Sequence, residues 1–253
     1  GSDVNNKGES ALQLKIRHTI PNQLVLPLGY HHIIQGIIYH SLAEEAGYSR
    51  QMHNQGYSAA DMGRCYKLFN FSLLRGKHHV VNRQIIFKDY VEWEVRSPDI
   101  YMIRLLESSF RKNGIQYGYQ RFKDPELQLE NETLEMDSAI IRMCSPICIY
   151  STDKDTKKTY FYSPDEEEFS WQVSDNFVRK YSACYGVSPE SGIWIMPLKV
   201  GRRDKYVTKY KGFYLSAWLG EYQLTGPRKN LDFLYQTGLG CRNSQGFGMF
   251  EIR

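Results

Sequence analysis

Residues 12–42 read LQLKIRHTIPNQLVLPLGYHHIIQGIIYHSL, and the fold can be worked out from this stretch. Apolar and polar side chains alternate over 12–20, which is the period of a half-buried strand. From 31 to about 46 the isoleucines recur at helical spacing, and Gly47 stands where a C-terminal cap belongs. The stretch therefore predicts a strand and then a helix, with the break between them beginning at Pro21.

The following residues complete one folding unit. The basic segment RGKHHVVN lies between two strand patterns, as the loop of a hairpin would. Ser97 and Pro98 supply an N-cap and a first-turn proline for a second helix. The order strand, helix, strand, strand, helix, strand is the ferredoxin-like plan. The elements predicted here are strands at 67–74, 85–96 and 116–122 and a helix from Ser97 to Gly114.

The second half of the chain repeats this order after a polar stretch at 124–137. We therefore expect an α+β protein of two tandem ferredoxin-like (RRM-like, βαββαβ) domains, at 11–128 and 129–253. Residues 1–10 are polar and have the character of a tag scar and a disordered segment. The second-half elements are predicted as strands at 139–150, 159–162, 193–200, 205–224 and the C-terminal end, and helices at 165–185 and from Pro227.

Bulk charge limits the kinds of partner. The chain has 32 Lys and Arg against 28 Asp and Glu, a net charge of +4, and a pI near 8.7. This balance is below that of a strongly basic DNA-binding domain, so a nucleic-acid surface must be a local patch. The chain has no run of about 18 apolar residues, which predicts a soluble, cytoplasmic protein without a membrane partner.

No metal or cofactor site is expected. The 5 cysteines are an odd number, are scattered and form no CxxC pair, which argues against a zinc site and a disulfide framework and favours reduced thiols. His31, His32 and His40 include adjacent positions that point apart on a helix, with no nearby carboxylate or cysteine partner.

The C-terminal run GLGCRNSQGFGMFEIR is rich in glycine. It is not a Rossmann fingerprint, because its glycines follow a helix and precede a strand. It also approximates an RRM strand signature, but that signature belongs on an interior strand. Glycine can bring backbone amides close to a phosphate; the alternative is a tight turn that only packs a helix against a sheet. The candidate RNA-binding residues of this run are Gly238, Gly240, Arg242, Asn243, Ser244, Gln245, Gly246 and Gly248.

A second candidate RNA surface is the basic stretch LKVGRRDKYVTKYK at 198–211. Its tyrosines, Tyr206 and Tyr210, alternate with cations in a way that would suit a phosphate track with base stacking. A solvated hairpin is the alternative interpretation. The cations proposed to bind RNA are Arg202, Arg203, Lys205 and Lys209.

GLG, a five-residue spacer and GFGM before the last strand resemble the C-terminal signature of the CRISPR-associated repeat endoribonucleases, the sixth Cas protein family of the RAMP superfamily. The run LPLGYHHIIQGIIYHSL is similar to the first helix of that family, and YKLFNFSLL to its second strand. The resemblance covers residues 12–253. It implies cleavage of CRISPR repeat RNA by attack of a 2′-hydroxyl, without a metal, to give 2′,3′-cyclic phosphate and 5′-hydroxyl ends.

The resemblance also implies an active site. It aligns the family's helix tyrosine with Tyr39, its histidine with His53 and its lysine with Lys67. The segment from His53 to Lys67 is longer than the family pattern, so His40 is the alternative base, with His31 and His32 as weaker candidates. Taken one by one, the three aligned residues could equally be a core-edge tyrosine, a solvated histidine and an exposed lysine.

Three functions follow in order of preference. The first is the repeat endoribonuclease, a monomer or homodimer that makes CRISPR RNA guides and has other CRISPR effector subunits as candidate partners. The second is a non-catalytic RNA-binding subunit of a CRISPR ribonucleoprotein. The third, a regulator that binds a small molecule, is disfavoured by the glycine signature.

Overall fold

The structure is a computed structural model that describes residues 11–44 and 68–253. No helix in these two ranges is long and apolar enough to cross a membrane. The described part of the first half contains two long helices and an antiparallel sheet. Its elements are β1 (Leu12–Pro27), α1 (His31–Glu44), β2 (Asn70–Phe71), β3 (Arg75–Val81), β4 (Gln84–Ser97), α3 (Ile100–Asn113), β5 (Ile115–Tyr117), β6 (Gln120–Phe122) and β7 (Glu126–Glu130).

The second half has the same composition of elements, with additional hairpins. Its elements are β8 (Ser138–Met143), β9 (Tyr150–Thr152), β10 (Thr159–Phe161), α4 (Glu168–Tyr185), β11 (Trp194–Lys199), the 3₁₀ turn η2 (Arg202–Asp204), β12 (Lys205–Tyr210), β13 (Phe213–Trp218), β14 (Glu221–Thr225), α5 (Arg228–Thr237), the 3₁₀ turn η3 (Asn243–Gln245) and β15 (Phe250–Ile252).

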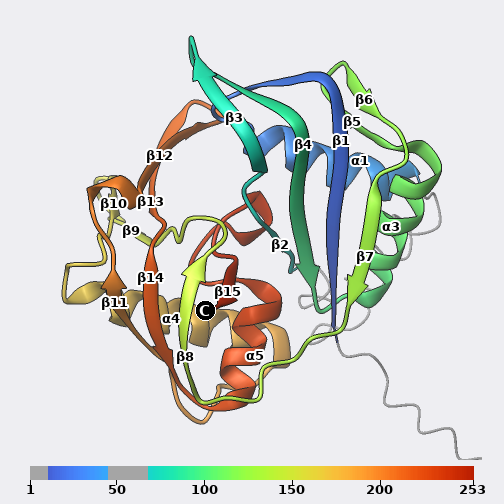
Figure 1. The fold of residues 1–253 in the computed structure, drawn as a ribbon. Helices are drawn as coiled ribbons and strands as arrows, with labels where there is room; N and C mark the ends of the chain where they lie inside the picture. The colour runs from blue at the N-terminus through green and yellow to red at the C-terminus, as the bar shows by residue number, and fades with distance from the viewer. Residues whose placement is uncertain (1–10, 45–67) are drawn as a thin grey trace, which may run out of the picture.

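The sheet orders confirm two ferredoxin-like units. The first sheet has the order β2-β4-β1-β7 and the second β11-β14-β8-β15, which is the same antiparallel order of second, third, first and fourth strand. Helices cover one face of each sheet (Figure 1). Each unit has its own core, with Leu14, Trp93 and Phe110 buried in the first and Phe177 and Leu224 in the second.

Two segments expected to be irregular are strands. The segment predicted as a basic loop is β3, which pairs with β4 through a turn at Asn82 and Arg83, where both residues have positive φ. Most β3 side chains are exposed, so this segment lacks the alternation of buried and exposed residues from which a strand is predicted. Part of the expected linker is β7, which pairs with β1, so the first sheet continues to Glu130, past the expected boundary at 128.

Several element boundaries also differ. β1 continues through Pro21 to Pro27, because a shift of register between Ile20 and Leu24 accommodates the break in the pattern. The N-cap of α3 is Asp99, which accepts from the Met102 amide at 3.2 Å, whereas the Ser97 hydroxyl accepts from the Asp99 amide. The strand expected at 139–150 is β8 followed by β9, and the one expected at 205–224 is β12, β13 and β14.

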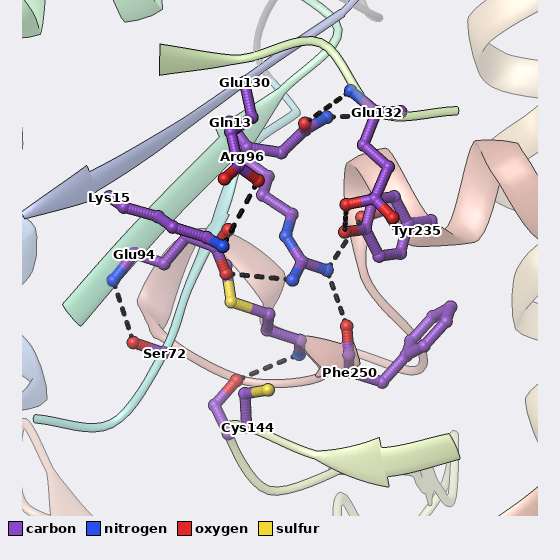
Figure 2. A network of polar contacts seen from close by, with 12 residues as sticks. Gln13, Lys15, Ser72, Glu94, Arg96, Glu130, Glu132, Cys144, Tyr235 and Phe250 are labelled. Atoms are coloured by element: carbon purple, nitrogen blue, oxygen red, sulfur yellow. Dashed lines mark hydrogen bonds and ion pairs between the residues drawn. The ribbon is translucent and has the colours of Figure 1, made fainter. Parts of the chain in front are cut away.

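A polar network joins the two units (Figure 2). Arg96 of β4 is buried, donates to the Phe250 carbonyl at 2.6 Å, and packs over the Tyr235 ring at 4.0 Å. Its other partner is Glu94, at 2.8 Å. Removing one member of such a buried pair typically costs about 3–5 kcal/mol. Through Arg96, the network connects β4 of the first unit to Tyr235 and Phe250 of the second.

Candidate functional site

Tyr39 lies on the exposed side of α1 with 50% of its surface accessible. Its ring meets Phe69 edge-on at 5.7 Å between centroids. Burial and the neighbouring Tyr210 raise the pKa of Tyr39, and a hydrogen bond with Ser244 opposes the rise. A tyrosine from the first unit and the glycine-rich loop of the second unit, identified from separate motifs, thus come together.

His53 and Lys67, the other two residues of the expected active site, lie outside the described residues. α1 ends at Glu44, and the description resumes at Leu68. Leu68 and Phe69 line a cavity of about 300 Å³ together with Arg242 and Ser244.

The described helix histidines differ in their surroundings. His31 is buried, its Nδ1 lies 3.0 Å from the Gln245 carbonyl oxygen, and its Nε2 lies 3.0 Å from the Tyr206 hydroxyl. Burial lowers the pKa of His31 to about 4. His40 is exposed and pairs with Glu44 at 3.0 Å. His31 therefore serves as a bridge between units, and His40 remains the alternative base.

Gln35, one turn after His31, was missed by the sequence reasoning. Its amide nitrogen donates to the Ser244 carbonyl at 3.0 Å, and its amide oxygen accepts from the Tyr210 hydroxyl at 2.6 Å. Positions i and i+4 share one face of a helix, so the spacing of His31 and Gln35 could have predicted that both side chains point to the same neighbour. This face of α1 binds both the glycine-rich loop and β12.

The glycine-rich loop is closed around Asn243. The buried Asn243 amide donates to the carbonyls of Leu239 at 3.0 Å and Phe247 at 2.9 Å. The backbone amides of Gly238, Gly246 and Gly248 donate to carbonyls within the protein. Because these three amides are already hydrogen-bonded, they cannot also donate to a phosphate. These glycines therefore determine the shape of the loop, and any donors to a phosphate belong to other loop residues. Positive φ at these glycines and at Gly240 excludes most side chains.

Replacing Gly248 by Ala is expected to destabilise the protein by about 3 kcal/mol or more. Gly248 has φ +91°, and an added Cβ would lie 2.0 Å from the Leu239 carbonyl oxygen, so backbone must move. The matched control is Gly212→Ala. Gly212 has φ +88°, and a Cβ added there would meet no atom within 4 Å, so this substitution should lower the free energy of unfolding by only about 1–2 kcal/mol. Chemical denaturation measures both, and equal losses would show that the close approach at Gly248 is not the cause.

The basic stretch runs from the end of β11 through η2 and β12, and β12 pairs with β13. Arg202, Arg203, Lys205 and Lys209 are exposed, as a binding surface requires. Tyr206 and Tyr210, which were expected to stack on bases beside these cations, instead hydrogen-bond to side chains of α1. Adjacent residues of a strand point to opposite faces. The sequence therefore already indicated that Tyr206 and Tyr210 lie on the face opposite to Lys205 and Lys209.

The exposed aromatic residues of this hairpin are on β13. Phe213 exposes 75% and Tyr214 70% of its surface. The Lys209 ammonium lies 5.6 Å from the centroid of the Tyr214 ring. The surface thus carries cations and aromatic rings, but from two strands rather than one.

Metal-ligating groups do not gather in the part of the chain that the structure describes, where no cluster of three or more His, Cys, Asp or Glu could hold an ion. Cys144, Cys148 and Cys241 are free thiols. Cys184 is in a disulfide, which corrects the expectation that all the cysteines are reduced.

Comparison with known proteins shows which proteins the chain resembles. Residues 128–252 match the model of the family described as CRISPR associated protein Cas6, C-terminal. The chain is 23% identical over 236 residues to the CRISPR-associated endoribonuclease Cas6 of Pyrococcus furiosus, which covers 90% of this chain and 83% of the relative. It is 22% identical over 247 residues to CRISPR-associated endoribonuclease Cas6 1 of Methanocaldococcus jannaschii, covering 94% and 92%.

A solved structure described as an RAMP protein binding different RNA substrates has the same fold. Its TM-score is 0.78 at 18% identity, and the match covers 96% of this chain and 99% of the other. The similarity therefore extends over both ferredoxin-like units. The second unit thus matches the Cas6 C-terminal family model, and the chain is similar to two CRISPR-associated Cas6 endoribonucleases along nearly its whole length.

Proposed function

We propose that this protein cleaves CRISPR repeat RNA by attack of a 2′-hydroxyl on the adjacent phosphate, without a metal, and so generates guide RNAs. The observation that carries the proposal is that Tyr39 packs on Phe69, which lines the same cavity as Arg242 and Ser244 of the glycine-rich loop. The two relatives named CRISPR-associated endoribonucleases support the reaction class.

The reaction needs a base for the 2′-hydroxyl, an acid for the leaving 5′ oxygen and positive charge near the phosphorane. His53 supplies the base, because an imidazole exchanges protons near neutral pH. Tyr39 orients the nucleophile or protonates the leaving oxygen, and its raised pKa keeps the phenol in the donating form. Lys67 stabilises the developing charge without having to titrate.

RNA reaches this site along the exposed face of the β12–β13 hairpin. The cations there can neutralise phosphates, and Tyr214, which lies opposite Lys209 in the β12–β13 ladder, offers a ring for base stacking. At the loop, Arg242, Ser244 and Gln245 provide polar groups beside the cavity and α1. The similar fold of an RAMP protein described as binding different RNA substrates supports an RNA ligand.

Incubation of end-labelled repeat RNA with the protein in excess EDTA tests the proposal. We expect cleavage at one position at the rate seen without chelator, with a cyclic phosphate on the 5′ fragment, because His53, Tyr39 and Lys67 meet all three chemical needs. Binding without cleavage would favour the non-catalytic subunit. Activity that disappears in EDTA and returns with Mg²⁺ would contradict the mechanism.

A further inference from the structure

Lys180 of α4 reaches the underside of the glycine-rich loop. Its ammonium donates to the Gly238 carbonyl at 2.6 Å, the Gly240 carbonyl at 3.1 Å and the Asn243 side-chain oxygen at 2.9 Å. A lysine ammonium has three donors, and all of them are used by these uncharged oxygens. The charge is thus held by the loop rather than by a carboxylate.

Lys180 and Asn243 together close the loop. The Asn243 oxygen accepts from Lys180, and its nitrogen donates to the carbonyls of Leu239 and Phe247. Without the ammonium, three oxygens would converge on one point with no donor between them, which costs free energy for each unmade bond. Lys180 therefore favours this loop conformation over others.

The closed loop forms one wall of the cavity of about 300 Å³. Lys180, Arg242, Ser244 and Phe69 all line this cavity, and Phe69 contacts Tyr39. Since the donors of Lys180 are occupied by the loop, its effect on RNA must pass through loop residues.

We propose that Lys180 is a positioning residue, whose ammonium holds residues 238–244 in the conformation that places Arg242 and Ser244 at the cavity beside Tyr39. The inference rests on the proposed function, since it assigns a role in that same site. Burial lowers the pKa of Lys180 to about 7, and the nearby Cys241 opposes this shift.

The test compares Lys180→Met, Lys180→Arg and Arg179→Met in the full chain. Arg179 is the matched control, because it precedes Lys180 on α4, exposes 66% of its side chain and pairs with Asp175 at 3.1 Å. In Lys180→Met we expect a single-turnover rate at saturating enzyme lower by about 10- to 100-fold, since small misplacements of catalytic groups have such effects. Lys180→Arg should recover most of this loss, and Arg179→Met should match the parent protein.

Hydrogen exchange provides a second measurement that needs no activity. The Leu239 amide donates to the Gly248 carbonyl within the loop, and the amides of Cys241 and Gly248 donate to the carbonyls of Cys148 and Pro146. In Lys180→Met these three amides should exchange about tenfold faster or more, with unchanged exchange in β8. If Lys180→Met does not fold, Lys180→Gln carries the same comparison, because it also removes the charge.

The outcomes separate the two proposals. If the parent protein binds repeat RNA and does not cleave it, the proposed function fails, and faster loop exchange in Lys180→Met still supports the positioning role. Unchanged exchange and rate in Lys180→Met would overturn the role of Lys180. Equal losses in Lys180→Met and Lys180→Arg, together with a lower melting temperature in both, would overturn it in favour of packing.

Discussion

A repeat RNA with a single 2′-deoxy nucleotide on the 5′ side of the cut is expected to bind normally and to resist cleavage completely. The proposed reaction uses the 2′-hydroxyl of that nucleotide as its nucleophile, so removing the oxygen removes the only attacking group. Binding should persist, because phosphate contacts and base stacking supply most of the affinity for a single strand. Gel-based cleavage assays and filter binding on the same labelled RNA measure the two quantities.

The control is the same substitution one nucleotide further along, which leaves the attacking hydroxyl in place and should be cleaved at nearly the parent rate. Cleavage of the first RNA at a normal rate would mean that water attacks the phosphate. A mechanism with activated water would then replace the one proposed, and the products would end in an ordinary phosphate.

The repeated element order could be predicted because local patterns encode it. Alternation over 12–20 and the isoleucine spacing from 31 each record a buried face, and both elements are present as β1 and α1. The sheet orders then follow from the ferredoxin-like plan. Prediction failed where burial is not the cause of structure: β3 is held mainly by backbone pairing with β4, and its exposed side chains show no period.

The site was predictable only in part, for a related reason. Tyr39 and the glycine motif were found because each belongs to a recognisable run, and the structure places Tyr39 against Ser244. Gln35 and Lys180 were missed, since their partners lie in the C-terminal loop and no local pattern marks a contact of that range. The role of a polar side chain whose partners lie far along the chain can be identified only once the fold is known.

Replacing His53 by Ala is expected to lower the single-turnover cleavage rate by roughly 10²- to 10⁴-fold, the usual contribution of a general base. Repeat affinity should stay within a few fold. An imidazole that removes the 2′-hydroxyl proton stabilises only the transition state, whereas one that contacts a phosphate would stabilise the bound ground state as well. Rate at saturating enzyme and equilibrium binding, measured on the same RNA, distinguish these two roles.

His40→Ala is the matched comparison, because His40 is the other accessible histidine near Tyr39 on α1 and pairs only with Glu44 among the described ion pairs. His31 is a poor candidate, since both ring nitrogens bond within the protein and burial lowers its pKa to about 4. If His40→Ala stops cleavage and His53→Ala is nearly silent, the base lies on the helix and the alignment through the long segment from 53 to 67 is wrong. If neither substitution changes the rate, neither His53 nor His40 is the base, and the proposed mechanism loses its main support.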